Sequence, residues 1–351
     1  MRATTPRTHR LTPRKAKSPL WAKFLVGVGV IMLAAATSAF AYASVLYDKV
    51  DGIQQEDILG NTTGDPNVEG PLNLLMIGAD LRADSDEPAR ADTIMILHID
   101  EKLRDADVVS IPRDLKVDID DCGEYKNSPC SDKINAAYTF GGPTPKGGAK
   151  NLANTVTDLT GIEFDGVALV NFEGFLEVVE TFGGIELCLE QDLDATHGGY
   201  YEEGCNRYKP DDALAIVRER YAWGSDYGRQ RMQQHFIKQL LKEADAQGYV
   251  KKPTKIPGLI DQVGDKMILD LGGTKPVDFA FELRGVDAGN IDMIQLPSES
   301  VETDDGQSYV DITEGQLQED AQALFEAFQN DTLDTWTKEH PDYMNEDPKD
   351  E

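Results

Sequence analysis

The sequence predicts an α/β domain with a mixed central sheet flanked by helices, preceded by one N-terminal transmembrane helix. Three observations support this fold class: short apolar runs typical of strands, longer amphipathic segments typical of helices, and an alternation of the two along the chain. Hydrophobic residues make up 40% of the 351 residues, which is enough for a large buried core. We therefore expect one folded domain over residues 71–328.

The N-terminal part of the chain predicts a membrane anchor. Residues 24–46 form an uncharged run of 23 residues, and about 20 helical residues cross the hydrocarbon core of a bilayer. Seven basic residues and no acidic residue precede the run, so the positive-inside rule places residues 1–23 in the cytoplasm and the domain outside the cell. A cleaved signal peptide is the alternative, because small residues at 39–43 resemble a cleavage site. Both interpretations export the domain.

Three strand-like runs follow a polar, glycine- and acid-rich segment, residues 47–70, which is typical of a stalk. The runs cover residues 72–78, 93–99 and 108–111. The short link between the second and third runs predicts a hairpin, and an antiparallel first strand would bring one end of all three strands together. The residues expected at that common end are Asp80, Asp92, Arg113 and Asp114.

Helical patterns dominate the middle of the chain. Residues 149–159 and 172–181 have helical periodicity, and Gly183 with Gly184 suits the C-terminal cap of the second helix. A strand is expected at residues 185–189. The clearest helix is at residues 226–244, with Asp226 as a possible N-cap.

The C-terminal part predicts the end of the core followed by a tail. Apolar segments at residues 293–296 and 321–328 should complete the domain. Residues 329–351 are charged and poor in apolar residues, so we expect this segment to be disordered.

The four cysteines lie in the part of the chain that is predicted to be exported, where thiols are expected to be oxidised. Three connectivities are possible from sequence alone. We favour Cys122 with Cys130 and Cys188 with Cys205, because each pair brackets a polar, loop-like segment. Free thiols are the alternative, and a zinc site is disfavoured because no Cys-x-x-Cys or Cys/His cluster is present.

The charge of the chain excludes one large class of function. With 34 basic and 63 acidic residues the net charge is −29, whereas nucleic-acid binding relies on Lys and Arg to neutralise phosphates. Asp80 and Asp92 nevertheless flank one loop, and two converging carboxylates suit Mg²⁺, which takes one or two protein carboxylates and completes its shell with water and phosphate oxygens. Solvated loop acids are the alternative for this pair.

Arginines accompany the two carboxylates. Guanidinium groups bind phosphate through two parallel hydrogen bonds and stay charged. On the clearest helix Arg229 and Gln233 are four residues apart and share a face. Arg218 and Arg220 point the same way in an extended chain and diverge in a helix, which the sequence leaves open. The set near the carboxylates is Arg82, Arg90, Arg113 and Lys133, and the later set is Arg218, Arg220, Arg229 and Gln233.

A carboxylate pair with several arginines is suited to phosphoryl transfer, in which positioning and charge neutralisation supply most of the catalysis. Other chemistries lack sequence support. The chain has no P-loop, no Gly-x-Ser-x-Gly elbow and no HExxH pair among its five histidines. Surface ion pairing with the plentiful acids is the alternative for each arginine taken singly.

Six segments in series resemble the LytR-CpsA-Psr (LCP) family of cell-wall phosphotransferases. The resemblance extends over about residues 72–245 and is carried by LNLLMIGADLR, ARADTIMILHID, VVSIPRD, KINAAYTFGG, VNFEGFLEVVETFGG and VRERYAWGSDYGRQRMQQ. It implies an LCP-like α/β domain that holds a polyprenyl (pyro)phosphate lipid in a hydrophobic tunnel. It also implies magnesium-dependent transfer of a glycopolymer to peptidoglycan, which forms a phosphodiester and releases polyprenyl phosphate.

The resemblance also implies roles for particular residues. Asp80 and Asp92 are similar to the family's metal-associated acids, and either is a candidate general base. Arg90 and Arg113 resemble phosphate contacts, and the other head-group binders would be Lys133, Arg218, Arg220, Arg229 and Gln233. Candidates for the lipid wall are Phe172, Phe175, Leu176 and Val179, although a core-facing helix would show the same pattern.

Two other functions remain open from the sequence. One is a pyrophosphatase that acts on the same lipid with water as the acceptor. The other is a non-catalytic module that binds or attenuates wall polymers. The sequence does not identify the polymer, the prenyl length or the oligomeric state.

Overall fold

The computed structural model describes residues 54–60, 68–79, 89–249, 267–287, 289, 291–302 and 306–346. The expected cytoplasmic segment 1–23 and transmembrane helix 24–46 lie outside these residues. Within the described residues, every helix is too short or too polar to cross a bilayer.

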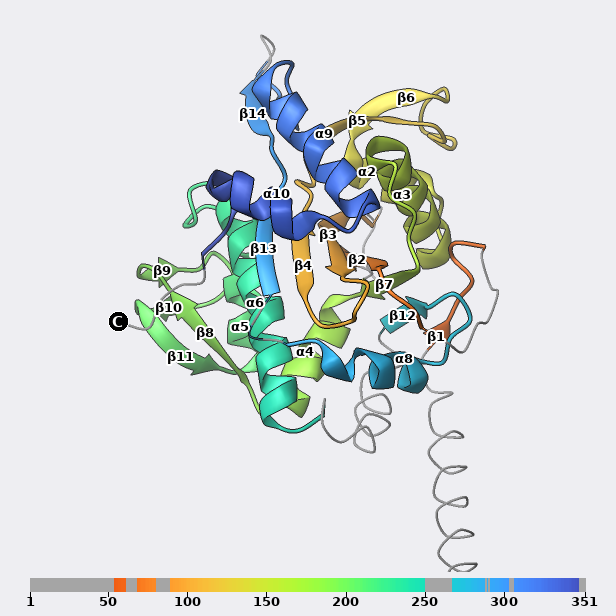
Figure 1. The fold of residues 1–351 in the computed structure, drawn as a ribbon. Helices are drawn as coiled ribbons and strands as arrows, with labels where there is room; N and C mark the ends of the chain where they lie inside the picture. Colours follow the sequence, from red (N-terminus) through yellow and green to blue (C-terminus); the bar gives the residue numbers. More distant parts are fainter. Residues whose placement is uncertain are drawn as a thin grey trace, which may run out of the picture. The chain divides into compact units, whose positions relative to one another are not determined.

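A seven-stranded mixed sheet forms the centre of the domain (Figure 1), with the strand order β1-β12-β7-β2-β3-β4-β13. The expected hairpin is confirmed, because β3 pairs antiparallel with both β2 and β4. The pairs β2–β7 and β4–β13 are parallel. The bounds of the seven strands are β1 Gln54–Gln55, β2 Leu72–Ala79, β3 Ala91–Ile99, β4 Ala106–Ser110, β7 Gly166–Val170, β12 Met267–Asp270 and β13 Ile291–Gln295.

Both faces of the sheet are buried because successive side chains of its strands point to opposite sides. Leu75 of β2 and Ile94 of β3 belong to one core cluster. Their neighbours Leu74 and Met95 belong to another cluster on the other face. The strands are therefore apolar on both sides, as expected for a sheet that is covered by helices on both faces.

Two groups of helices cover the two faces (Figure 1). Helices α2 Ile134–Phe140, α3 Pro145–Thr160, α9 Gln316–Gln329 and α10 Leu333–Glu339 pack against the face of Leu75. Helices α6 Asp226–Ala246 and α8 Pro276–Glu282 pack against the face of Leu74. A smaller core cluster joins α6 to α4 Phe172–Thr181 and α5 Pro210–Arg218. The α/β architecture with a mixed, helix-flanked sheet is thus as predicted.

Among the residues that the structure describes, four two-stranded sheets lie outside the central sheet. The strand expected at residues 185–189 is present as β8 but pairs only with β11 in one of them. These sheets and the short helices have the bounds β5 Lys116–Ile119 with β6 Cys130–Lys133, β8 Ile185–Leu189 with β11 Gly204–Tyr208, β9 Leu193–Asp194 with β10 Tyr200–Tyr201, β14 Glu299–Glu302 with β15 Ser308–Asp311, η4 Leu283–Gly285 and η5 Pro341–Tyr343.

Both expected disulfides are present, Cys122–Cys130 and Cys188–Cys205. The first closes the loop before β6, and the second joins residues that face each other on β8 and β11. The disulfide therefore covalently links the two strands that flank the segment containing β9 and β10.

Local capping explains where the two central helices begin and end. The Asn171 side chain accepts a hydrogen bond from the backbone N–H of Gly174 at the start of α4. The α4 helix ends in a turn in which Gly183 has a positive φ of 70°. This agrees with the C-terminal cap that was expected at Gly183 and Gly184. Ser225, rather than the predicted Asp226, caps α6 by accepting from Gly228. Asp226 is the first residue of the helix and is available for another contact.

Two predicted segment boundaries are wrong. Residues 329–346 are not a disordered tail, because α10 places Leu333 and Trp336 in the main core at 2% and 4% exposure. Part of the predicted stalk also belongs to the domain, since Ile58 is fully buried and its N–H donates to the buried carboxylate of Asp270 at 2.7 Å. Both segments have few apolar residues, but Ile58, Leu333 and Trp336 among them are buried.

Candidate functional site

A cavity of about 460 Å³ lies between the central sheet and helices α4, α5 and α6. Strands β2, β3, β7 and β12 supply one wall, and the three helices supply the other. It lies on the face of the sheet that contains Leu74 and Met95. The smaller core cluster of α4, α5 and α6 borders the cavity through Phe175, Val217 and Phe236.

The cavity is polar at one end and apolar at the other. Along α6 the lining changes from Arg229 and Gln233 to Phe236 and Leu241. Leu241 lies about 18 Å from Arg229 at the helical rise per residue. Along β3 the lining changes from Asp92 to Leu97 in the same direction, because Leu97 and Leu241 meet in one apolar cluster. An amphipathic molecule with a charged head and a hydrocarbon chain matches this lining.

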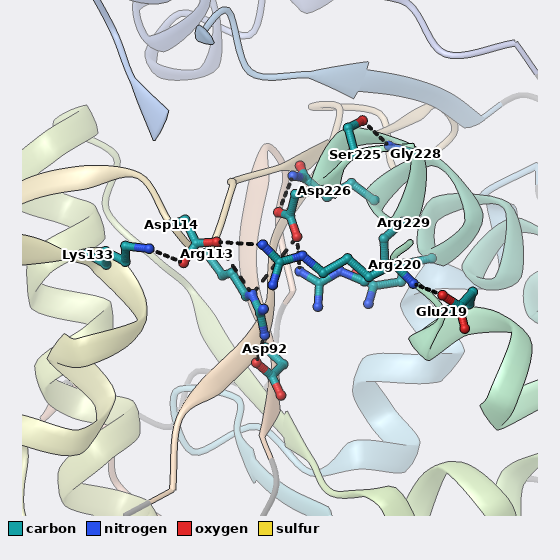
Figure 2. Close-up of polar contacts among 12 residues, drawn as sticks. Asp92, Arg113, Asp114, Lys133, Glu219, Arg220, Ser225, Asp226, Gly228 and Arg229 are labelled. Carbon is teal, nitrogen blue, oxygen red and sulfur yellow. Dashed lines mark hydrogen bonds and ion pairs between the residues drawn. The ribbon is translucent and has the colours of Figure 1, made fainter. Parts of the chain in front are cut away.

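Arg113 lies at the centre of the polar end, immediately after β4 (Figure 2). Its guanidinium donates a short hydrogen bond from Nη1 to Oδ1 of Asp92, at the start of β3. Its Nε lies 3.9 Å from Oδ1 of Asp226, at the start of α6. Asp226 in turn contacts Nη2 of Arg229 at 2.6 Å, one helical turn further on. Residues from three distant parts of the sequence thus form one ionic network.

Asp114 extends this network to a second set of cations (Figure 2). Its carboxylate lies 3.1 Å from Nζ of Lys133, at the end of β6, and 3.6 Å from Nη2 of Arg220. It also lies 3.9 Å from Nε of Arg113. A single carboxylate therefore fixes the relative positions of three of the predicted phosphate contacts.

The polar end carries an excess of positive charge. With Arg218, which lines the cavity, the described residues here supply five cationic side chains and three carboxylates. Two buried nitrogens, Nε of Arg113 and Nε of Arg229, have no hydrogen-bond partner within the described part of the chain. Buried donors without partners are costly, so both indicate a site for an anion that accepts hydrogen bonds.

Burial and neighbouring carboxylates act in opposite directions on the two buried arginines. Burial lowers the pKa of Arg229, and neither Asp226 nor Asp92 fully offsets this effect. Burial also acts to lower the pKa of Arg113, but Asp92, Asp114 and Asp226 together hold it above its ordinary value. Arginine remains protonated in either case, so both guanidinium groups are permanent cations of the site.

The end of α5 settles how Arg218 and Arg220 are arranged. Arg218 is the last residue of the helix, Glu219 is extended, and both arginines line the cavity. The Glu219 carboxylate is buried but accepts backbone hydrogen bonds from Arg220 and Tyr221, both at 2.8 Å. Burial would raise the pKa of Glu219, whereas these and other backbone hydrogen bonds lower it to about 2. The carboxylate therefore stays ionised and holds the segment in place.

The structure brings together most of the predicted head-group residues. Asp80 and Arg82 lie outside the described residues. Arg90 is exposed and is not among the residues that line the cavity. The predicted residues at or beside the polar end are Asp92, Arg113, Lys133, Arg218, Arg220, Arg229 and Gln233.

Of the three lipid-wall candidates whose side chains the structure describes, Phe175 alone lines the cavity. Its ring stacks on Phe236 of α6 at 4.5 Å between ring centroids. Val179 is instead fully buried in the smaller core cluster, and Leu176 lines a different, acidic depression on the outside of α4. The side chain of Phe172 is outside the described set. The α4 face that meets the cavity is the one with Phe175 and Val178.

The sequence analysis missed several residues of the site. Asp226 was interpreted as a helix cap, although it is an ionic partner of Arg229. His197 lines the cavity from a turn between two very short strands, and no pattern in the sequence indicated it. A detectable signal existed for the apolar wall, since the stripe of Phe236, Leu240 and Leu241 continues from Arg229 and Gln233 on one side of α6.

No group of three or more His, Cys, Asp or Glu side chains that could hold a metal ion is found among the described residues. Asp92 is the described member of the predicted magnesium pair, and 36% of its side chain is exposed at the polar end of the cavity. A carboxylate oxygen beside a cationic phosphate-type site is a suitable donor for Mg²⁺, which usually takes few protein ligands.

The fold and this cavity define an α/β protein with a cavity that is cationic at one end and apolar at the other. The chain belongs to the LytR_cpsA_psr family, whose model matches residues 34–326. The cell wall biosynthesis protein LcpA of Corynebacterium glutamicum is 28% identical over 342 residues, a match that covers 87% of this chain and 65% of LcpA. The polyisoprenyl-teichoic acid–peptidoglycan teichoic acid transferase TagU of Halalkalibacterium halodurans is 27% identical over 290 residues, with 79% of this chain and 89% of TagU covered.

Solved structures have the same fold. TagV of B. subtilis superposes with a TM-score of 0.61 at 22% identity and covers 76% of this chain and 99% of TagV. A structure of TagT bound to LIIa-WTA has a TM-score of 0.56 at 21% identity, and covers 77% of this chain and 93% of TagT.

Proposed function

We propose that this chain transfers a glycopolymer from a polyprenyl diphosphate carrier to peptidoglycan. The observation that carries the proposal is the cavity, in which one end has an excess of cationic side chains and the other end, about 18 Å away along α6 at the helical rise per residue, is apolar. The transferase names of the TagU relatives and the bound ligand of the TagT structure support it. The polymer would be of the teichoic acid, arabinogalactan or capsule class.

The carrier lipid would lie with its prenyl chain between β3 and α6. Phe175, Phe236 and Leu240 would contact the hydrocarbon, and burial of each CH₂ group contributes about 0.8 kcal/mol. The diphosphate would then lie at Arg113, Arg218 and Arg229. The buried Nε atoms of Arg113 and Arg229 would donate to its oxygens and gain the partners that they lack among the described residues.

The reaction requires little beyond positioning and charge neutralisation. A hydroxyl oxygen of peptidoglycan would attack the phosphorus that bears the glycopolymer and form a phosphodiester. The bond from that phosphorus to the bridging oxygen would break, and polyprenyl phosphate would leave with the negative charge. The arginines would stabilise the charge that develops on both phosphates in the transition state.

Asp92 and Asp80 have two candidate roles in this step. They would hold Mg²⁺, which supplies further charge neutralisation at the phosphate oxygens. One of them would also accept the proton of the attacking hydroxyl. The Oδ1 atom of Asp92 accepts a hydrogen bond from Arg113, which would hold this carboxylate beside the proposed phosphate site.

We also propose that residues 24–46 anchor the chain in the cell membrane with the catalytic domain outside the cell. The uncharged run of 23 residues and the basic residues before it support this topology. A membrane-anchored domain would take its lipid carrier from the outer leaflet, and peptidoglycan lies on the same side.

The test is a transfer assay with the full-length chain in liposomes. Lipid-linked glycopolymer is supplied with isolated peptidoglycan, and covalently attached polymer is measured after the lipid is extracted. Arg113→Ala should abolish attachment, while Arg231→Ala, an exposed arginine of α6 outside the cavity lining, should not. Phosphate release without attachment would favour a pyrophosphatase. Polymer binding that survives Arg113→Ala, with no product of either kind, would favour a non-catalytic wall-polymer module.

A further inference from the structure

A turn outside the predicted site brings a histidine to the cavity. His197 lies between β9 and β10, in the segment that the Cys188–Cys205 disulfide closes. It lines the same cavity as Leu214 and Arg218 of α5. Within the described residues, neither ring nitrogen of its exposed imidazole forms a hydrogen bond or an ion pair.

One carboxylate holds this turn against the arginine segment. The backbone N–H of Thr196, the neighbour of His197, donates to Oε2 of Glu219 at 2.6 Å. The other oxygen of Glu219 accepts from the N–H groups of Arg220 and Tyr221. Because Glu219 lies between Arg218 and Arg220 in the chain, the position of His197 is coupled to that of the two arginines.

Close packing also fixes the turn on α5. A Cβ atom at Gly198 would lie 2.6 Å from Cβ of Ala215 and 2.8 Å from Oη of Tyr201, so a glycine is needed at this approach. Tyr201 in turn donates to Asp212 of α5 at 2.9 Å. Leu214 and Arg218 are one turn apart on the same helix. Because Thr196 and Arg220 both donate to Glu219, the turn that carries His197 lies against the segment of Arg218 and Arg220.

We propose that His197 contacts the substrate and donates a ring N–H to an oxygen of the bound diphosphate. This inference rests on the proposed function, since it places the diphosphate at Arg218. An imidazole carries an N–H donor whether neutral or protonated, and its protonated form adds to the positive charge of the site. The exposed ring is positioned by contacts of its neighbours Thr196 and Gly198, which is the arrangement expected of a residue held for a ligand.

The test measures the binding of two probes to the full-length chain in detergent micelles. Geranylgeranyl diphosphate supplies the anion and the hydrocarbon, and geranylgeraniol supplies the hydrocarbon alone. His197→Ala should weaken diphosphate binding by about tenfold or more, as for one hydrogen bond to a charged group, and leave the alcohol's affinity unchanged. His197→Gln, which keeps an N–H donor, should recover most of the loss. Glu202→Gln, an exposed change in the same segment, is the matched control.

The outcomes separate this inference from the proposed function. If Arg113→Ala loses the preference for the diphosphate while His197→Ala binds it as the wild type does, the histidine has no contact with the anion and the function stands. Equal losses for both probes in His197→Ala would assign the residue a structural role and overturn the inference. If the wild type binds both probes alike, the anion site itself is wrong and both proposals fail.

Discussion

Asp226 and Arg229 form an ion pair of 2.6 Å within the first turn of α6, and both side chains are less than a tenth exposed. The pair faces Arg113, whose Nε lies 3.9 Å from the same Asp226 oxygen. Breaking a buried ion pair by removal of one partner leaves an uncompensated charge. Asp226 therefore stabilises two arginines that would otherwise repel each other in a partly dehydrated site.

Asp226→Asn should lower the free energy of unfolding by about 3 kcal/mol, because the Arg229 guanidinium would remain buried without its counter-charge. Urea denaturation of the full-length chain measures this. A saturating diphosphate lipid should restore more stability to the variant than it adds to the wild type, since the anion would replace the lost carboxylate. Asp211→Asn, an exposed acid in the first turn of α5, is the control. Equal destabilisation by the two substitutions would contradict this role of Asp226.

The cationic end of the cavity could be predicted because its chemistry depends on residue type and strand order. A short link forces β3 and β4 to pair, which places Asp92 and Arg113 at the same end of the sheet. The arginines of α5 and α6 were also identifiable, although only the structure shows that Arg218 ends its helix and that Glu219 directs Arg220 to the same cavity.

The missed features depend on contacts between segments that are distant in sequence. α10 has little apolar content, and Trp336 is buried because α10 joins the core cluster to which α9 belongs. The position of His197 depends on Gly198 meeting Ala215, a contact that no local pattern encodes. Val179 and Phe175 lie four residues apart on α4, yet one faces the core and the other the cavity, because the core cluster covers only part of that face.

Asp107 gives the domain a pH-dependent stability. It is a residue of β4 that is 7% exposed and lies opposite Asp292 of β13 and His98 of β3. Burial is the main cause, and the nearby carboxylates of Asp292 and Asp334 add to it; together they raise the pKa of Asp107 from 3.8 to about 7. The folded protein thus binds a proton that the unfolded chain has released, and the free energy of unfolding falls as the pH rises from about 4 to about 7.

Asp107→Asn should remove this dependence, because the amide stays neutral at every pH. Between pH 5 and pH 8 the stability difference between variant and wild type should change by about 2–3 kcal/mol in favour of the variant. Urea denaturation at the two pH values measures the difference. Asp118→Asn, an exposed position on β5, should show no such change. A wild type whose stability rises relative to Asp107→Asn over this interval would contradict the prediction.

The two disulfides should differ in their effect on stability because they close loops of different length. The Cys188–Cys205 pair is separated by 17 residues and the Cys122–Cys130 pair by 8. Loop-closure entropy predicts losses of about 3 kcal/mol and about 2.5 kcal/mol when each pair is replaced by serine. Urea denaturation of the two double variants measures which of them loses more of the free energy of unfolding. Only the Cys188→Ser/Cys205→Ser variant should also weaken diphosphate binding, since it frees the segment that carries His197.

Magnesium dependence tests the role of Asp92. A chelator should stop glycopolymer transfer, and added Mg²⁺ should restore it. Substitution of a residue that hydrogen-bonds to a metal ligand typically lowers metal affinity about tenfold or more. If Asp92 is itself a ligand, Asp92→Asn should therefore raise the Mg²⁺ concentration for half-maximal transfer by at least about tenfold. Calorimetry of Mg²⁺ binding in the presence of geranylgeranyl diphosphate gives a readout independent of activity. Asp120→Asn changes an exposed acid after β5 and is the control. An unchanged Mg²⁺ requirement in Asp92→Asn would exclude Asp92 as a metal ligand.

Filling the apolar end of the cavity should make binding depend on the length of the prenyl chain. Ala168 of β7 lines the cavity level with Met95 of β3, three residues from Asp92 in the direction of Leu97, because both residues are paired with Met76 of β2. Ala168→Leu should weaken geranylgeranyl diphosphate while leaving the affinity for inorganic diphosphate unchanged, because the cationic end lies at the other end of α6. If the leucine displaces about three CH₂ groups of the prenyl chain from the cavity, the binding free energy weakens by about 2 kcal/mol, which is roughly thirtyfold in affinity. Ala244→Leu adds the same side chain to α6 outside the cavity lining and serves as the control. Equal losses for the long and the inorganic ligand would show that the substitution acts on the whole domain rather than on the lipid wall.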